Sequence, residues 1–246
     1  MSGVKSAILG AYGGIGQSLC SEISSHGGIA FLMGRDSSKL SETADRFGFS
    51  FATVDASNWD QTDQAMDIAS TAMNGLNAVV CLVGSVLLKP LHLTSRVEWD
   101  ATIQTNLAAA AGALRSAVTR MPEGGSVVLI SSAAAHVGLS NHEAIAAGKA
   151  GIEGLVRSAA MTYAAKGIRV NAIAPGLVQT PLTQRVWGNP RSAEVSLAMH
   201  PIGRFGNPED IARAIYFLID PSNSWITGQV LGVDGGLGTL KPMSAR

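Results

Sequence analysis

The sequence is poor in cysteine, in aromatic residues and in net charge. Its 246 residues include two cysteines, Cys20 and Cys81, which excludes a disulfide framework and a cysteine-rich metal site. There are 18 basic residues (lysine plus arginine) and 18 acidic residues (aspartate plus glutamate). The chain therefore has no excess positive charge with which to bind nucleic acid or an anionic membrane surface. The four tryptophans are too dispersed to stack bases, and the five histidines show no metal-ligand spacing.

Long hydrophobic runs are also missing. No uninterrupted apolar stretch reaches about 18 residues, so no membrane span is expected. The opening segment, residues 1–5, leads directly into an apolar run and lacks a signal-peptide layout. Because 46% of the residues are apolar, the chain can still bury a sizeable core. The sequence therefore predicts a cytoplasmic globular protein without membrane or nucleic-acid partners.

Short apolar runs alternate along the chain with stretches of helical length. This alternation predicts βαβ units and a parallel sheet that is buried on both faces. Because such connections are right-handed, we expect a Rossmann-like, doubly wound α/β sheet of about seven strands, in one domain spanning residues 1–246. The predicted strands are 7–9, 29–33, 50–54, 78–83, 127–130, 168–174 and 230–233. The predicted helices are 15–25, 38–47, 59–73, 97–120, 143–165 and 208–218.

Residues 176–206 form the longest stretch without a clear strand or helix pattern, and several prolines interrupt it. Long loops in compact domains often act as lids, so we interpret this segment as a substrate flap, with a merely decorative insertion as the alternative. Its apolar side chains predict an apolar substrate, although they would equally close a pocket against water. These side chains are Leu177, Val178, Leu182, Val186, Trp187, Leu197 and Met199.

A glycine-rich loop, residues 10–16, lies between the first predicted strand and the first predicted helix. Gly10, Gly14 and Gly16 give the spacing GxxxGxG, which differs from the common GxGxxG fingerprint. Glycines here permit a tight turn and a close approach of pyrophosphate to a helix N-terminus. The position of the loop favours dinucleotide binding, with Tyr12 and Ile15 as further contacts, over a purely structural turn.

The end of the second predicted strand bears on the choice of dinucleotide. An acidic residue there typically binds the ribose hydroxyls of NAD, but Gly34 occupies that position and Arg35 follows it. Arginine can pair with the additional phosphate of NADP, so NADP(H) is favoured over NAD(H). In the alternative interpretation, Asp36 binds the ribose and Arg35 is only solvated.

Together these features resemble the short-chain dehydrogenase/reductase family, and the resemblance covers nearly the whole chain. Further matches are Asp55, Asn106, Ser131-Ser132, Lys149-Ala150-Gly151, the stretch 171–176, Thr180 and the stretch 233–236. The resemblance implies a nicotinamide cofactor, a small-molecule substrate and a homodimer or homotetramer. It implies cofactor binding by Gly10, Tyr12, Gly14, Ile15, Gly16, Arg35, Asp55, Gly84, Lys149, Pro175, Val178 and Thr180.

One departure from the family pattern concerns catalysis. The family's tyrosine should stand four residues before Lys149, where this chain has Ile145. None of the three tyrosines of the chain is followed by lysine at that spacing. The resemblance leaves Ser132, Lys149 and Asn106 as catalytic candidates and removes the usual proton donor.

The sequence offers one local candidate to replace the tyrosine. Ser140 and Glu143 have capping-box spacing, which predicts a helix start at Asn141. His142 would then share a helical face with Lys149 and could act as a general acid; the alternative is a surface histidine. His136 and His200 are weaker candidates and are expected to be exposed loop residues.

The sequence leaves three functions open. The first is an NADP(H)-preferring oxidoreductase with an altered proton-donor site, reducing an unidentified carbonyl, enone or imine. The second is a catalytically silent, cofactor-binding regulator or helper subunit. The third is a lyase or isomerase that uses the same pocket without net redox chemistry.

Overall fold

A seven-stranded parallel sheet forms the centre of the molecule. The computed structural model describes residues 3–241, and its strand order is β3-β2-β1-β4-β5-β6-β7. Every neighbouring pair is parallel, which confirms the predicted doubly wound α/β fold. Residues 1 and 2 of the opening segment lie outside the described range. The strands are β1 (Lys5–Leu9), β2 (Ile29–Gly34), β3 (Ser50–Thr53), β4 (Ala78–Cys81), β5 (Gly125–Ile130), β6 (Ile168–Pro175) and β7 (Val230–Val233).

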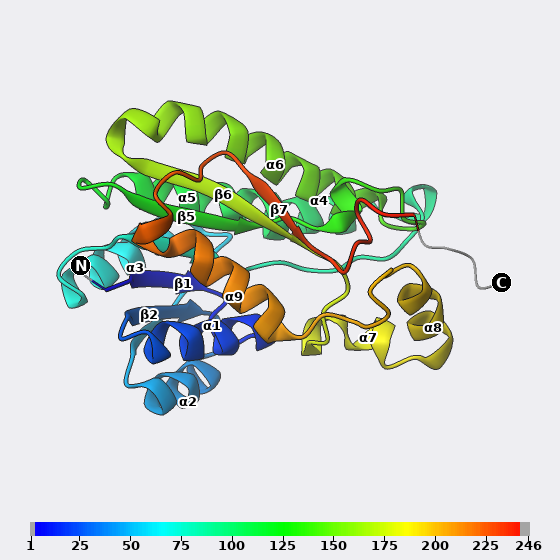
Figure 1. The fold of residues 1–246 in the computed structure, drawn as a ribbon, viewed down its shortest axis with the longest axis horizontal. Coiled ribbons are helices and arrows are strands. Elements are labelled where there is room, and N and C mark those ends of the chain that lie inside the picture. Colours follow the sequence, from blue (N-terminus) through cyan, green and yellow to red (C-terminus); the bar gives the residue numbers. More distant parts are fainter. Residues whose placement is uncertain (1–2, 242–246) are drawn as a thin grey trace.

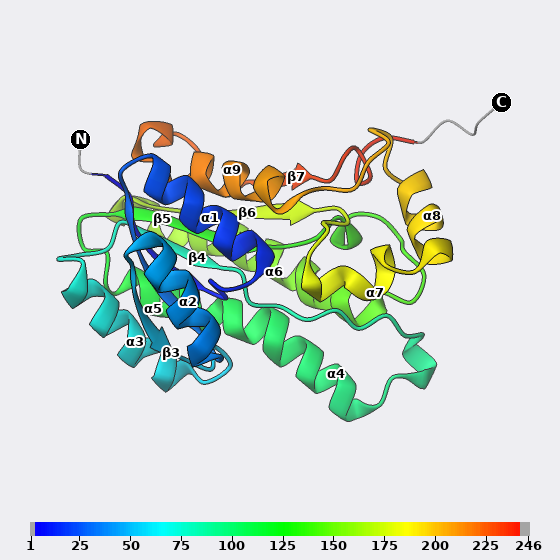
Figure 2. The same ribbon diagram turned by 90° about the horizontal axis from the view of Figure 1, so that it is seen from below.

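Helices cover both faces of this sheet (Figures 1 and 2). Helices α1, α2 and α9 pack on one face, and α3, α4, α5 and α6 lie on the other. The helices are α1 (Gly14–Ser25), α2 (Ser37–Phe47), α3 (Trp59–Ala72), α4 (Arg96–Ile103), α5 (Ala109–Val118), α6 (Glu143–Tyr163), α7 (Gln184–Trp187), α8 (Pro190–Ala198) and α9 (Pro208–Ile219).

Each strand sends alternate side chains into two different cores. In β4, Val79 packs with the core beneath α3, α5 and α6, whereas Val80 packs with the core beneath α1 and α9. Both side chains are fully buried. Because both faces are covered, the strands consist of continuous apolar runs instead of alternating patterns. This is why the sequence locates the strands well.

The predicted helix 97–120 is interrupted in the structure, so the prediction of one continuous helix was wrong. A π-helical segment, Gln104–Ala108, separates α4 from α5. The side-chain amide of Asn106 donates a hydrogen bond to the carbonyl of Thr102, four residues earlier, at 2.9 Å. A side chain that bonds into the helical ladder distorts it locally, and such segments recur at functional sites.

The flap segment, residues 176–206, is more regular than predicted. It contains α7, α8 and a 3₁₀ turn, Pro181–Thr183, in place of an irregular loop. Pro181 and Pro190 each stand at the start of a helical turn, where a missing backbone N–H costs nothing. The prolines therefore mark helix starts. Their number suggested irregular structure because proline interrupts helices at any later position.

Within residues 3–241, none of the helices combines the length and apolar character needed to cross a membrane. The same part of the chain holds no group of three or more histidine, cysteine, aspartate or glutamate side chains arranged to hold a metal ion.

Candidate functional site

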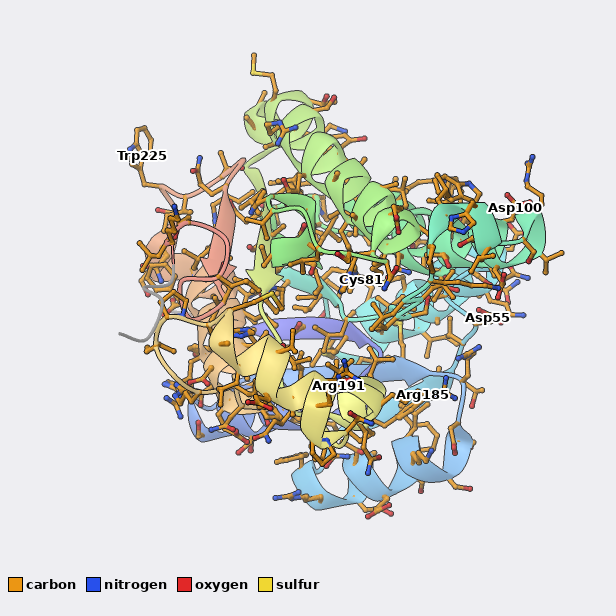
Figure 3. The ribbon with its side chains drawn as sticks, turned by 90° about the vertical axis from the view of Figure 1, so that its right-hand side faces the viewer. Asp55, Cys81, Asp100, Arg185, Arg191 and Trp225 are labelled. Atoms are coloured by element: carbon orange, nitrogen blue, oxygen red, sulfur yellow. The ribbon has the colours of Figure 1, made fainter. Side chains whose placement is uncertain are left out.

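A cavity of about 710 Å³ opens at the carboxyl ends of the strands. It lies where the strand order reverses between β1 and β4, the usual ligand site of doubly wound sheets. Figure 3 looks toward this edge, with the flap residues Arg185 and Arg191 in front and Trp225 pointing away into solvent. The cavity is lined by most of the site residues predicted from the sequence: Gly10, Tyr12, Gly14, Ile15, Gly16, Arg35, Asp55, Gly84, Asn106, Ser132, Lys149, Pro175, Val178 and Thr180.

The glycine loop forms a close-fitting wall between β1 and α1. Gly10 has a left-handed φ of +84°. A Cβ atom on Gly16 would lie 2.3 Å from the carbonyl oxygen of Ala11, so no larger residue fits there without moving the backbone. Helix α1 begins without a side-chain cap on its first turn. An uncapped helix N-terminus that faces a cavity is suited to a phosphate group.

Two cations lie at the end of the cavity near β2. Arg35 and Lys39 both line it, and the Lys39 ammonium lies 5.7 Å from the centroid of the Tyr12 ring. A Cβ atom on Gly34 would lie 2.5 Å from Cε1 of Tyr12, so glycine makes room for this ring. Lys39 was missed in the sequence analysis; its position in the first turn of the helix after β2 is the signal that could have found it.

The two aspartates near this end have different roles. Asp36 caps α2 by accepting a hydrogen bond from the backbone N–H of Lys39 at 3.1 Å, which lowers its pKa, and it is not among the residues lining the cavity. Asp55 does line the cavity. Its carboxylate accepts hydrogen bonds from the side chain and backbone of Ser57, which lower the pKa of Asp55, and the charge of Arg35 adds to this effect.

Lys149 lies at the other end of the cavity and is 6% exposed. Its ammonium donates a hydrogen bond to the carbonyl of Ile130 at 2.8 Å. Among the described residues it forms no salt bridge, and desolvation lowers its pKa to about 8. Ile145, one turn earlier on α6, is buried and also lines the cavity. The buried ammonium and an apolar side chain one turn earlier therefore border the same cavity.

Asn106 is fully buried and organises the loop after β4. Its side-chain oxygen accepts a hydrogen bond from the backbone N–H of Ser85 at 3.2 Å, and its amide donates to the Ser85 hydroxyl at 3.0 Å. A Cβ atom on Gly84 would lie 3.1 Å from Asn106 Oδ1 and 3.5 Å from Lys149 Nζ. Ser85, which lines the cavity, was missed in the sequence analysis, although it directly follows Gly84, one of the predicted cofactor-binding residues.

His142, the proposed replacement acid, is not among the cavity-lining residues. Its Nδ1 donates to the carbonyl of Ser140 at 2.8 Å. Helix α6 begins at Glu143, not at Asn141, and no side chain caps it, so the predicted capping box was wrong. The reason is the left-handed backbone of Asn141, with φ of +65°, which turns the chain before the helix starts.

His200 is buried, contrary to the prediction of an exposed loop histidine. Its Nδ1 donates to the carbonyl of Ser196 at 2.7 Å, and its Nε2 accepts from the backbone N–H of Leu177 at 3.0 Å. Both ring nitrogens are therefore used to fasten α8 to the start of the flap. His136, the remaining candidate, is an exposed loop residue as predicted, and its Nε2 lies within hydrogen-bond distance of Glu153 of α6.

The shape and donor set of the cavity fit a nicotinamide dinucleotide. One end offers two cations and a glycine that admits the Tyr12 ring, and the middle offers an uncapped helix N-terminus. The other end offers the buried Lys149 ammonium beside Gly84. A ribose, a pyrophosphate and a second ribose would meet these groups in that order.

Comparison with known proteins agrees with this geometry. The sequence pattern of a family described as enoyl-(acyl carrier protein) reductase matches residues 10–238. The chain belongs to the short-chain dehydrogenase/reductase family. A cis-4-hydroxycyclohexanecarboxylate dehydrogenase from Sinomonas cyclohexanicum is 39% identical over 187 residues, 74% of each chain. A galactitol 2-dehydrogenase from Cereibacter sphaeroides is 31% identical and is aligned over 96% of this chain and 95% of its own.

The solved structures of short-chain dehydrogenases/reductases show the same fold. A short-chain type dehydrogenase/reductase from Mycobacterium ulcerans superposes with a TM-score of 0.92 and 27% identity, over 97% of this chain and 91% of its own. Members of this family are oxidoreductases that use nicotinamide cofactors. The relatives named here are dehydrogenases, which does not favour a regulator or a lyase.

Proposed function

We propose that this short-chain dehydrogenase/reductase is an NADP(H)-preferring oxidoreductase that reduces a small, largely apolar carbonyl, enone or imine at a site with an altered proton donor. One observation carries the proposal. In the cavity that would hold the cofactor, the apolar side chain of Ile145 lies one helical turn before the buried Lys149 ammonium.

The NADP preference is supported by the charges near β2. Arg35 and Lys39 both line this end of the cavity, and Gly34 offers no carboxylate at the end of β2, where NAD-binding sites typically have one. The rival ligand, Asp36, is engaged in capping α2 and in an ion pair with Lys39 at 3.3 Å. Guanidinium and phosphate form strong charge-assisted hydrogen bonds, so Arg35 is the primary partner.

When bound, the reduced nicotinamide supplies the hydride. The residues of the chain then bind the cofactor and the substrate and orient them toward each other. We assign to Ser132 the binding of the substrate oxygen, and to Lys149 the binding of the nicotinamide ribose and the stabilisation of negative charge. Asn106 holds Ser85 and the loop after β4 in place. Val86 and Leu182 line the cavity and are exposed, which favours an apolar substrate portion near the entrance.

The missing tyrosine restricts the chemistry. Loss of a general acid typically costs about 10²- to 10⁴-fold in rate. An iminium already carries its proton, and an enone can take a proton from water after conjugate addition. We therefore expect such substrates to be reduced faster than simple ketones.

The first experiment is a fluorescence titration of the purified protein with NADPH and with NADH. Tighter binding of NADPH supports the proposal and justifies a panel of cyclic iminium ions, enones and ketones. Reduction that is lost in Ser132→Ala would establish the oxidoreductase. Cofactor binding without any turnover would favour the silent regulator, and product formation without a change in nicotinamide absorbance would favour a lyase or isomerase.

The oligomeric state and the cytoplasmic location stay predictions. The family resemblance favours a homodimer or homotetramer, and sedimentation analysis of the purified chain would measure its size in solution.

A further inference from the structure

The segment that carries Ser132, residues 131–136, is held at both ends by one buried carboxylate. This segment connects β5 to the loop before α6 and contains the 3₁₀ turn Ala133–Ala135. Glu153, on α6, is 7% exposed. Its Oε1 accepts a hydrogen bond from the Ser131 hydroxyl at 2.7 Å. The Nε2 atom of His136 lies 2.8 Å from Oε1 and 2.9 Å from Oε2.

We propose that Glu153 is a positioning residue for Ser132. It acts through Ser131 on one side of the segment and through His136 on the other. This inference rests on the proposed function, because it assigns to Ser132 the task of orienting the substrate oxygen. It adds a residue that does not line the cavity and that the family motifs quoted above do not include.

The hydrogen bonds leave Ser132 little freedom between these two anchors. Its Oγ accepts a hydrogen bond from the backbone N–H of Ala134 at 3.2 Å, which starts the 3₁₀ turn. Ser131, the residue before Ser132, is 2% exposed. Its hydroxyl, which bonds Glu153, also lies 3.3 Å from the carbonyl oxygen of Lys149. Glu153 thus ties the Ser132 segment to the same helix that positions the Lys149 ammonium.

Burial gives Glu153 a strong requirement for these partners. A buried carboxylate is costly unless hydrogen bonds and a counter-charge satisfy it. An ionised carboxylate accepts from the Ser131 hydroxyl and from His136 at the same time. An amide in its place keeps one oxygen but loses the negative charge, and it puts an N–H donor where Oε2 lies 2.9 Å from His136, so the paired contact to the imidazole is lost.

The far side of His136 faces the turn after β7. A Cβ atom on Gly238 would lie 3.9 Å from Nδ1 of His136 and 2.6 Å from Oδ2 of Asp234. The Asp234 carboxylate itself accepts hydrogen bonds from the backbone N–H groups of Gly236 and Gly238 at 2.9 and 2.8 Å. Asp234 is therefore occupied in its own turn, and Glu153 is the carboxylate bonded to His136.

The test compares Glu153→Gln with Glu143→Gln, an exposed glutamate on the first turn of the same helix. The first measurement is hydrogen exchange of residues 132–136 in the protein without added cofactor or substrate. We expect at least tenfold faster exchange in Glu153→Gln and no change in Glu143→Gln. This readout does not depend on turnover, so it separates failure of the positioning role of Glu153 from failure of the proposed function.

The second measurement uses steady-state kinetics with NADPH and a substrate found in the panel. Misplacement of a reacting group by about 1 Å can cost about 100-fold, so we expect kcat to fall about 10- to 100-fold in Glu153→Gln. The Kd for NADPH and the KM for substrate should stay within about twofold. Ser131→Ala combined with Glu153→Gln should be no slower than Glu153→Gln alone, because both changes disrupt one unit.

Unchanged exchange together with unchanged kcat in a folded Glu153→Gln protein would overturn the inference. A fall in kcat accompanied by an equal rise in the Kd for NADPH would also overturn it, because the whole site would then be affected. If Glu153→Gln does not fold, Ser131→Ala and His136→Asn each remove one anchor and are measured in the same way. His92→Asn, at an exposed histidine, serves as their control.

Discussion

Ile145 and Lys149 lie one helical turn apart on α6, and both line the same cavity. The isoleucine is 5% exposed and the lysine 6%, so both side chains are withdrawn from bulk water. The family resemblance expects a tyrosine hydroxyl at position 145, within reach of the lysine and of Ser132. Here the helix presents to the cavity an apolar side chain and, one turn later, a buried cation.

Restoring the hydroxyl should restore carbonyl reduction. We predict that Ile145→Tyr raises the rate of ketone reduction by about 10²- to 10⁴-fold, the usual contribution of a general acid. The measurement is NADPH oxidation with a ketone that the unchanged protein reduces slowly or not at all.

The matched control for this change is Ile145→Phe, because phenylalanine has the ring of tyrosine but lacks its hydroxyl. A gain in Ile145→Tyr that is absent from Ile145→Phe would show that Ser132, Asn106 and Lys149 are correctly placed. Equal rates in the two variants would contradict the assignment of position 145 to the proton donor.

The burial of Lys149 should make stability rise with pH. Its pKa is about 8 in the folded protein and 10.5 for an ordinary lysine. Between these values the unfolded chain binds a proton that the folded chain does not, so the free energy of unfolding increases with pH. The full difference corresponds to about 3 kcal/mol, of which about 1 kcal/mol falls between pH 7 and 9.

Lys149→Met should remove this increase, and urea unfolding between pH 7 and 9 measures it. The window ends at pH 9 because burial raises the pKa of Cys20 to about 12 and of Cys81 to about 11, which acts in the opposite direction at higher pH. Lys166→Met, at an exposed lysine, should leave the slope unchanged. Parallel slopes for the unchanged protein and Lys149→Met would show that the ammonium is well solvated.

Arg35 should decide the cofactor preference. We predict that Arg35→Ala weakens NADPH binding about 10- to 100-fold and leaves NADH binding within about twofold, because a charge-assisted hydrogen bond contributes about 1.5–3 kcal/mol. Arg46→Ala, on the last turn of α2, is the control for general charge. A selective loss of NADH binding in Asp36→Ala would instead favour the rival ribose ligand.

The sequence was sufficient for the sheet and for the position of the cavity. Strands such as β4 are buried on both faces, so their continuous apolar runs are visible without any tertiary information. The glycine loop could be placed because it lies between such a strand and a helix. Both features could be predicted because each depends on residues that are close together in the sequence.

Contacts between distant residues could not be predicted in this way. The bond from the Asn106 side chain to Thr102 interrupts a segment whose residues otherwise favour a helix. Glu153 binds partners 22 and 17 residues away, and nothing in its own helix indicates them. The same holds for His200, whose partner Leu177 is 23 residues away. Its sequence context suggested an exposed loop instead.

The glycine loop gives the sharpest steric prediction. In Gly16→Ala the new Cβ atom would meet the backbone of Ala11 at 2.3–2.8 Å, and backbone atoms cannot move aside as a flexible side chain can. Overpacking of this kind costs about 1–3 kcal/mol and would shift the first turn of α1, where the pyrophosphate is expected to bind. We predict a loss of NADPH affinity of at least about tenfold, with a lower Tm.

Gly154→Ala is the matched control, because this helical glycine has no neighbour within 4 Å of the added Cβ atom. It should stabilise the protein by about 0.5–1 kcal/mol, through the lower backbone entropy of alanine in the unfolded chain, and leave NADPH binding unchanged. If Gly16→Ala also bound NADPH with unchanged affinity, the close approach of α1 to the cofactor would be refuted. The dinucleotide would then have to bind elsewhere along the cavity, and the ordering of its groups between Arg35 and Lys149 would fail with it.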